Sequence, residues 1–233
     1  MTFHTENILD YLLLFAGVLV VVFVPYISRV ASWFVTIVHE TGHGVMSIIL
    51  PGVSLSSFKL HSNGAGESGS SHQVGPFYKL SRIIELFSGY SFPIYLGTAM
   101  IAAAALFDNT TFGVIVLVAM GVLTLVYLRN WFGLLILVVY FSVLFVLWAL
   151  RMHLNEEYVI VFMGLLFLVR GLYDLISASV LVFGEYDESG SDFHLLEEET
   201  HIPAKFWYVF YILFQFMVVV GFYLVVPIDI SIV

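Results

Sequence analysis

The stretch Val38-His39-Glu40-Thr41-Gly42-His43-Gly44 lies inside an almost entirely apolar run, residues 31–50. If this run is helical, His39 and His43 project from one face about one turn apart, with Glu40 beside them. Two neutral imidazoles at this spacing can bind one zinc ion, and an adjacent carboxylate that is not a ligand can take a proton from zinc-bound water. The pattern is short, but burying ionisable residues in an apolar span costs free energy, so such residues generally serve a function. We interpret His39 and His43 as zinc ligands and Glu40 as the catalytic base.

The composition of the whole chain indicates a membrane protein. Of its 233 residues, 61% are hydrophobic and 11% are charged, and the mean hydropathy is +1.01, which exceeds that of ordinary soluble domains. The chain has no cysteine, so a thiolate metal site and a cysteine nucleophile are excluded. Its net charge of -9 argues against nucleic acid as a partner. We expect a single integral membrane domain over residues 1–233, embedded in a lipid bilayer.

The fold class predicted from the apolar segments is an all-α polytopic membrane protein with about seven transmembrane helices, each long enough for a hydrocarbon core of roughly 30 Å. The first segment has no preceding basic region and no evident cleavage site, so we expect it to be a retained helix. The expected spans are about residues 8–26, 31–50, 86–107, 112–128, 131–150, 158–183 and 203–226.

Two segments depart from the helical pattern. Residues 53–75 partly alternate apolar and polar side chains around a glycine-rich turn, which predicts a small β-hairpin after the histidine helix. Residues 184–203 are acidic and predict a solvated loop. In the seven-span arrangement, the basic residues that share a side with the N-terminus are Lys59, Lys79, Arg82, Arg129 and Lys205. The positive-inside rule therefore predicts that the N-terminus, the hairpin and the acidic loop are cytoplasmic.

Further motifs follow the histidine stretch along the chain. They are Gly52 with the hairpin after it, Phe87-Ser88-Gly89-Tyr90, Leu128-Arg129-Asn130-Trp131-Phe132-Gly133, Val169-Arg170-Gly171-Leu172-Tyr173-Asp174-Leu175, and Ser191-Asp192 leading to Ile202-Pro203 and Trp207. Together with H-E-T-G-H, the one motif that is specific by itself, they resemble the compact bacterial branch of the site-2 protease family of intramembrane zinc metalloproteases. The resemblance extends over most of the chain.

This resemblance implies a protein of the bacterial cell membrane that acts in regulated intramembrane proteolysis on a membrane-protein substrate. It also implies that the hairpin helps to present the substrate in extended form, and that an aspartate from a later helix completes the zinc site. In better-known members that aspartate belongs to an Asp-Gly motif. No Asp-Gly occurs in this chain, so the third ligand cannot be assigned by motif.

The candidates for the third ligand are Asp174, Asp192 and Asn130. At a rise of 1.5 Å per residue, His43 and Asp174 both lie roughly 12–14 Å below the cytoplasmic ends of their helices, so their depths match. Asp174 could instead pair with Arg170, four residues earlier on the same helix. Asp192 falls in the polar loop and could reach the metal only if that loop folded back into the membrane. We favour Asp174 and retain Asp192 as the alternative.

Three further residues are candidates for substrate binding. His61 and His72 flank the hairpin turn and could line a groove, although loop histidines are commonly just exposed. Asn130 could bind an oxyanion or the substrate backbone, or it could cap a helix. The hypothesis from the sequence is a membrane zinc endopeptidase in which Glu40 activates zinc-bound water to hydrolyse a bond in a transmembrane segment. The alternative is a non-proteolytic membrane scaffold or binding protein that retains the fold.

Overall fold

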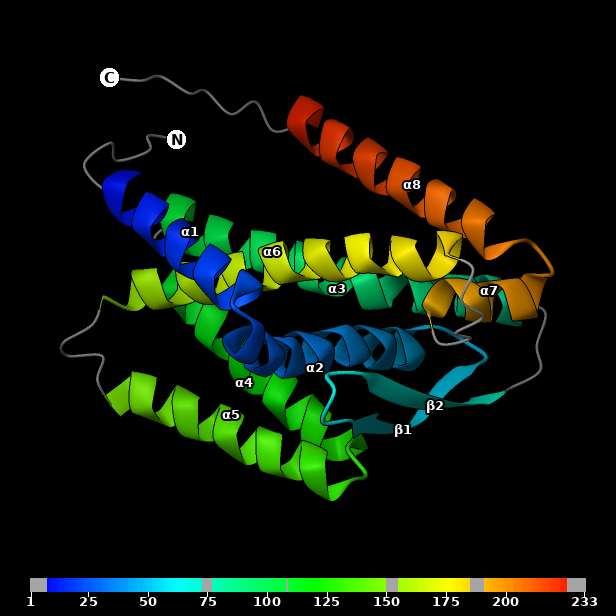
Figure 1. The fold of residues 1–233 in the computed structure, drawn as a ribbon, viewed down its shortest axis with the longest axis horizontal. Helices are drawn as coiled ribbons and strands as arrows, with labels where there is room; N and C mark the ends of the chain where they lie inside the picture. Colours follow the sequence, from blue (N-terminus) through cyan, green and yellow to red (C-terminus); the bar gives the residue numbers. More distant parts are fainter. Residues whose placement is uncertain (1–7, 73–76, 108, 150–154, 185–190, 226–233) are drawn as a thin grey trace.

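The structure is a computed structural model, and it describes residues 8–72, 77–107, 109–149, 155–184 and 191–225 (Figure 1). Helices dominate these residues, and one antiparallel hairpin interrupts them. In chain order the elements are α1 (Ile8–Phe23), α2 (Pro25–Ile49), β1 (Val53–Leu60), β2 (Gly66–His72), α3 (Tyr78–Phe107), α4 (Thr110–Tyr127), α5 (Trp131–Ala149), α6 (Glu156–Phe183), α7 (Asp192–Thr200) and α8 (Ala204–Val225).

The long helices correspond to the apolar segments of the sequence, which confirms an all-α membrane protein with a small hairpin. By length and composition, four helices in the described residues qualify as membrane spans, namely α3, α4, α6 and α8. A fifth is obtained if α1 and α2, which meet at an angle of 98°, are one broken span. α5 is a shorter apolar helix by the same test, so the prediction of about seven spans is compatible with this arrangement.

The junction of α1 and α2 changes the expected path of the chain. Pro25 opens α2, a position where its missing N–H removes no helical bond. The start of α1 lies against the start of α6, because the Tyr11 hydroxyl donates to Glu157 and the Tyr158 hydroxyl donates to Asp10. The hairpin and α7 lie at the opposite end of the bundle (Figure 1). The two helices therefore form one bent path rather than the expected antiparallel pair, and the side of the membrane on which the chain starts stays a prediction.

Close helix crossings hold α2, α3 and α6 together. A Cβ atom on Gly97 of α3 would lie 2.4 Å from the Gly164 oxygen of α6, and one on Gly42 of α2 would lie 2.8 Å from the Ser88 oxygen of α3. Small residues at such positions permit close backbone approach inside a membrane. The crossing at Gly42 presses the histidine-bearing face of α2 against α3.

The hairpin is confirmed, and its two outer edges differ in whether another backbone segment covers them. β1 pairs with β2 from Val53 opposite His72 to Leu60 opposite Gly66. The other edge of β1 is occupied by the turn between α4 and α5, where the Arg129 N–H donates to the Phe58 oxygen at 2.9 Å. Within the described residues, the outer edge of β2 pairs with no other strand. That edge is therefore the one available to a further extended segment.

The acidic segment is not a solvated loop throughout, because residues 192–200 form the helix α7. Phe193 and Leu196, one turn apart, are both buried against a cluster that includes Trp207 and Tyr211 of α8. Burial of this apolar stripe stabilises a helix that its acidic composition alone does not favour. The loop prediction weighed the charges of the segment and overlooked the spacing of its apolar residues.

Candidate metal centre

Three possible ligand atoms converge where α2 meets α7. The Nε2 atoms of His39 and His43 lie 3.1 Å apart, as their spacing on one helical face requires. Asp192 Oδ2 lies 3.2 Å from His39 Nε2 and 3.5 Å from His43 Nε2. Tetrahedral zinc with bonds of about 2.0–2.1 Å would separate its ligand atoms by about 3.3 Å. Within the described residues, these are the side chains whose ligand atoms group closely enough to hold one ion.

The surroundings of these atoms also fit a metal ion. Asp192 Oδ2 is buried and makes no hydrogen bond of normal geometry with any described residue. Burial alone would raise the pKa of the Asp192 carboxyl, but His43 and His39 hold that pKa below its usual range. Gly89 of α3 faces the site, and a Cβ atom there would lie 2.5 Å and 2.6 Å from the two Nε2 atoms. The glycine therefore leaves open the space in which two nitrogens and a carboxylate, a donor set typical of zinc, converge.

His43 is oriented from behind by α3. Its Nδ1 lies 2.9 Å from the Glu85 backbone oxygen and 3.6 Å from a Glu85 carboxylate oxygen. Glu85 is only 1% exposed and pairs with Arg82, whose Nε lies 4.0 Å from Glu199 of α7. A hydrogen bond at Nδ1 fixes the tautomer that leaves Nε2 free to bind a metal. Sequence reasoning missed this group, although Glu85 inside an apolar helix was a signal of it.

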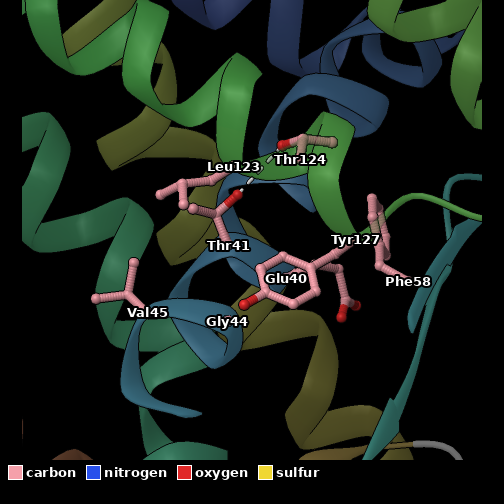
Figure 2. A pocket seen from close by; sticks show the side chains of 8 residues that line it. All are labelled: Glu40, Thr41, Gly44, Val45, Phe58, Leu123, Thr124 and Tyr127. Atoms are coloured by element: carbon pink, nitrogen blue, oxygen red, sulfur yellow. Dashed lines mark hydrogen bonds between the residues drawn. The ribbon is translucent and has the colours of Figure 1, made fainter. Parts of the chain in front are cut away.

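Glu40 lies beside the three-ligand group without joining it. The residue is 6% exposed, and its Oε2 has no hydrogen-bond partner among the described residues. Gly66 of the hairpin covers it, since a Cβ atom on that glycine would lie 2.1 Å from Oε1. Figure 2 shows a small cavity bordered by Glu40, Thr41 and Tyr127, whose volume of about 10 Å³ is close to that of one water site. Glu40 is thus a buried carboxylate with one oxygen that has no hydrogen-bond partner among the described residues.

A much larger cavity opens in front of the ligand group. Its volume is about 520 Å³, and both polar and apolar side chains of α2, α3, α6 and α7 line it together with the hairpin turn. His39, Glu40 and Asp192 all face this cavity, and Gly64 and Gly66 contribute the hairpin side. A polypeptide segment entering it would contact the ligand group and the candidate base together.

The structure separates the two candidate aspartates. Asp174 lines the same cavity, as its matched depth predicted, but Arg170 Nε donates to its Oδ1 at 2.9 Å. Arg170 also donates to Ser28 at 2.7 Å, which ties this pair to the start of α2. Asp192, the alternative from the sequence, is the aspartate next to both histidines. Asp192 is the first residue of α7. The docking of this helix brings Asp192 to the histidines, so no loop has to fold back into the membrane.

Two of the three residues considered for substrate binding, Asn130 and His61, lie outside the lining of this cavity. Asn130 binds the hairpin, because its Oδ1 accepts from Leu60 N at 3.2 Å and its Nδ2 donates to Leu60 O at 2.7 Å. His61 has an exposed side chain, with Nε2 3.2 Å from a Glu67 oxygen. His72 ends β2, and its side chain lies outside the described part of the chain. Neither His61 nor Asn130 belongs to the lining of the large cavity.

The apolar helices and the group of two histidines and one aspartate define a class of protein: integral membrane proteins with a side-chain group that could hold a metal ion. The chain belongs to the Peptidase M50B-like family, whose family model matches residues 12–222. This confirms the resemblance to the site-2 protease family and indicates a membrane protease. No curated protein and no solved structure matched the chain.

Proposed function

We propose that this protein is a zinc-dependent endopeptidase that hydrolyses a peptide bond in a transmembrane segment of another membrane protein. The observation that carries the proposal is the convergence of His39, His43 and Asp192 beside Glu40, at one wall of the large cavity. Two histidines and one carboxylate leave a fourth position for water or substrate, as a catalytic zinc site requires. This arrangement needs no Asp-Gly motif, which the chain lacks.

We assign the third ligand to Asp192 rather than Asp174. Asp174 Oδ1 already lies 2.9 Å from each of two nitrogens of the Arg170 guanidinium. If Asp174 bound a metal ion instead, the guanidinium would lose its charge partner in an apolar wall. Among the described residues, Asp192 Oδ2 forms no ion pair with a lysine or arginine, and the two imidazoles lie beside it. A bound metal ion would supply the positive charge that this buried oxygen needs.

The chemistry divides between the ion and the side chains. Zinc, when bound, would polarise the scissile carbonyl and lower the pKa of bound water toward about 7. Glu40 then accepts a proton from the attacking water and delivers it to the leaving amine. Its position on α2 next to His39, with one oxygen that has no hydrogen-bond partner among the described residues, suits both transfers. His43 keeps its orientation through Glu85.

The substrate segment has to unwind before it is cleaved, because the peptide bonds of an intact helix are shielded by their own hydrogen bonds. The outer edge of β2 offers an extended segment the main-chain partners that it lost on unwinding. That edge borders the same cavity through the hairpin turn, at Gly66 and Glu67. The hairpin would thus deliver the unwound segment to the wall that carries Glu40.

The proposal includes an orientation in the bacterial cell membrane. The hairpin and α7 lie at the end of the bundle that also carries most of the basic residues, so we place this end in the cytoplasm. A cleavage site near that end would release a cytoplasmic fragment, which is the product expected in regulated intramembrane proteolysis. The basic residues in question are Lys59, Lys79, Arg82, Arg129 and Lys205.

The test compares the wild-type protein with Glu40→Gln in detergent solution. The probe is a synthetic apolar peptide that carries a fluorophore, a quencher and a glycine–proline pair to weaken its helix. We expect cleavage by the wild type, loss of cleavage in Glu40→Gln, and about one zinc ion per chain in both proteins. Cleavage by Glu40→Gln would refute the enzymatic role of this centre. Zinc binding without cleavage by either protein would favour the non-proteolytic scaffold.

A further inference from the structure

Tyr90 of α3 is wedged between the two elements that carry the ligand group. Its ring stands edge-on to the His39 ring, with centroids 4.9 Å apart and planes at 87°. Its opposite contact is with Phe193 of α7, where the rings are stacked at 5.2 Å and 11°. Phe193 directly follows Asp192 in the chain. The tyrosine ring therefore packs against one candidate ligand and against the neighbour of another.

The hydroxyl of Tyr90 has a different environment from its ring. Tyr90 lines the 520 Å³ cavity together with His39, Glu40 and Asp192. Its hydroxyl makes no hydrogen bond within the described part of the chain, whereas the nearby Tyr211 hydroxyl lies 2.9 Å from Ser91 Oγ. Because Tyr90 lines the cavity and its O–H group has no acceptor among the described residues, that group is available to a molecule that enters the cavity.

Several other side-chain donors around the cavity are already engaged. Thr36 donates to the Gly64 oxygen at 2.7 Å, and Ser32 donates to the Arg29 oxygen at 2.7 Å. The guanidinium of Arg170 is shared between Asp174 and Ser28. Asn130, which the sequence offered as an oxyanion donor, is bonded to the hairpin instead. Of the lining residues, Tyr90 combines an unengaged donor with direct contact to His39.

We propose that Tyr90 is a further catalytic residue, whose hydroxyl donates a hydrogen bond to the oxygen of the scissile carbonyl as negative charge develops there. This inference rests on the proposed peptidase function. In the reaction, the water oxygen bonds to the carbonyl carbon, the C–N bond breaks, and the proton taken up by Glu40 goes to the amine. The Tyr90 proton stays on its oxygen, so the residue stabilises charge without transferring a proton.

The variant Tyr90→Phe tests this role, because it removes the hydroxyl and keeps the ring contacts with His39 and Phe193. With the fluorogenic apolar peptide as probe, we expect kcat to fall about 10²–10³-fold while KM changes little. Zinc affinity, measured by competition with a chromogenic chelator, should be that of the wild type. Tyr211→Phe is the matched control, since it removes a hydroxyl engaged with Ser91 outside the cavity lining and should leave kcat unchanged.

A binding measurement separates this role from turnover. The probe is the same peptide with a phosphonamidate, a tetrahedral anion, in place of the scissile amide. Tyr90→Phe should bind the zinc-loaded phosphonamidate at least about tenfold more weakly than the wild type, yet bind a reduced-amide version, which lacks the oxygen, equally well.

Each outcome decides between the two proposals. Unchanged kcat and phosphonamidate affinity in Tyr90→Phe would overturn the catalytic role of the hydroxyl and leave the peptidase assignment intact. Loss of zinc from Tyr90→Phe would also overturn it, since the hydroxyl would then serve the metal site. If the wild type cleaves no faster than Glu40→Gln, the peptidase function itself fails and this inference fails with it.

Discussion

Gly89 gives the most direct test of the metal centre, because a single added methyl group would enter the space between the ligand atoms. In Gly89→Ala the new Cβ would lie 2.5 Å from His43 Nε2 and 2.6 Å from His39 Nε2. Ordinary contacts between such atoms begin near about 3.4 Å, so one or both imidazoles would have to move by about 0.8 Å. Ligand distances in a zinc site vary by only about 0.2 Å.

The required displacement is about four times that tolerance. Loss of an outer-shell partner alone lowers metal affinity about 10–100-fold, so displacement of the ligands themselves should cost at least about 100-fold. The fold should tolerate the change better than the metal site does. Alanine stabilises a helix by about 1 kcal/mol relative to glycine. Overpacking near the buried His43 would destabilise the fold by about 1–3 kcal/mol, so the two effects partly cancel.

The assay is the shift in thermal unfolding that zinc confers, together with chelator competition. The wild type should gain stability when zinc is added, whereas Gly89→Ala should unfold at nearly the same temperature with and without zinc. Gly221→Ala is the control, because a Cβ atom there would meet nothing within 4 Å. Wild-type zinc affinity in Gly89→Ala would refute the placement of the metal between these nitrogens.

The remaining predictions concern the third ligand and the hairpin. Asp192→Asn should lose most of its bound zinc by metal analysis, whereas Asp174→Asn should retain it; the reverse result would return the assignment to Asp174. Asn130→Ala removes both hydrogen bonds to Leu60 and leaves two backbone groups unsatisfied, at a cost of about 1–3 kcal/mol each. We expect faster amide exchange at Leu60 and slower peptide cleavage with zinc still bound, and unchanged exchange would show that the contact is dispensable.

The parts of the fold that depend on local pattern could be predicted from the sequence. The spacing of His39 and His43 places both imidazoles on one helical face whatever surrounds them, and the alternation in residues 53–60 led directly to β1. The hairpin and the long apolar helices followed from the same periodicities. The 98° angle between α1 and α2 could not be predicted from the sequence, because it depends on how α1 packs against α6.

The third ligand could not be chosen from the sequence for a related reason. The matching depths of His43 and Asp174 agree with the position of Asp174 in the cavity lining. Depth does not determine which partner a carboxylate binds, and Arg170 lies four residues away on the same helix. Asp192 reaches the histidines because α7 docks through Phe193 and Leu196. That stripe could have predicted a helix, but its place against α8 is a tertiary contact that no local pattern specifies.

Because Asp192 is on α7, the three candidate ligands belong to two helices that are not held equally firmly in the protein. Two ligand atoms belong to a helix that apolar spans enclose, while the third belongs to a nine-residue helix held by packing and by the Arg82–Glu199 contact. Detachment of α7 would break the centre, so we expect bound zinc to stabilise the docking of this helix against heat. Asp192 and Leu195 of α7 also line the large cavity, so a displacement of this helix would change the cavity wall and the set of metal ligands together.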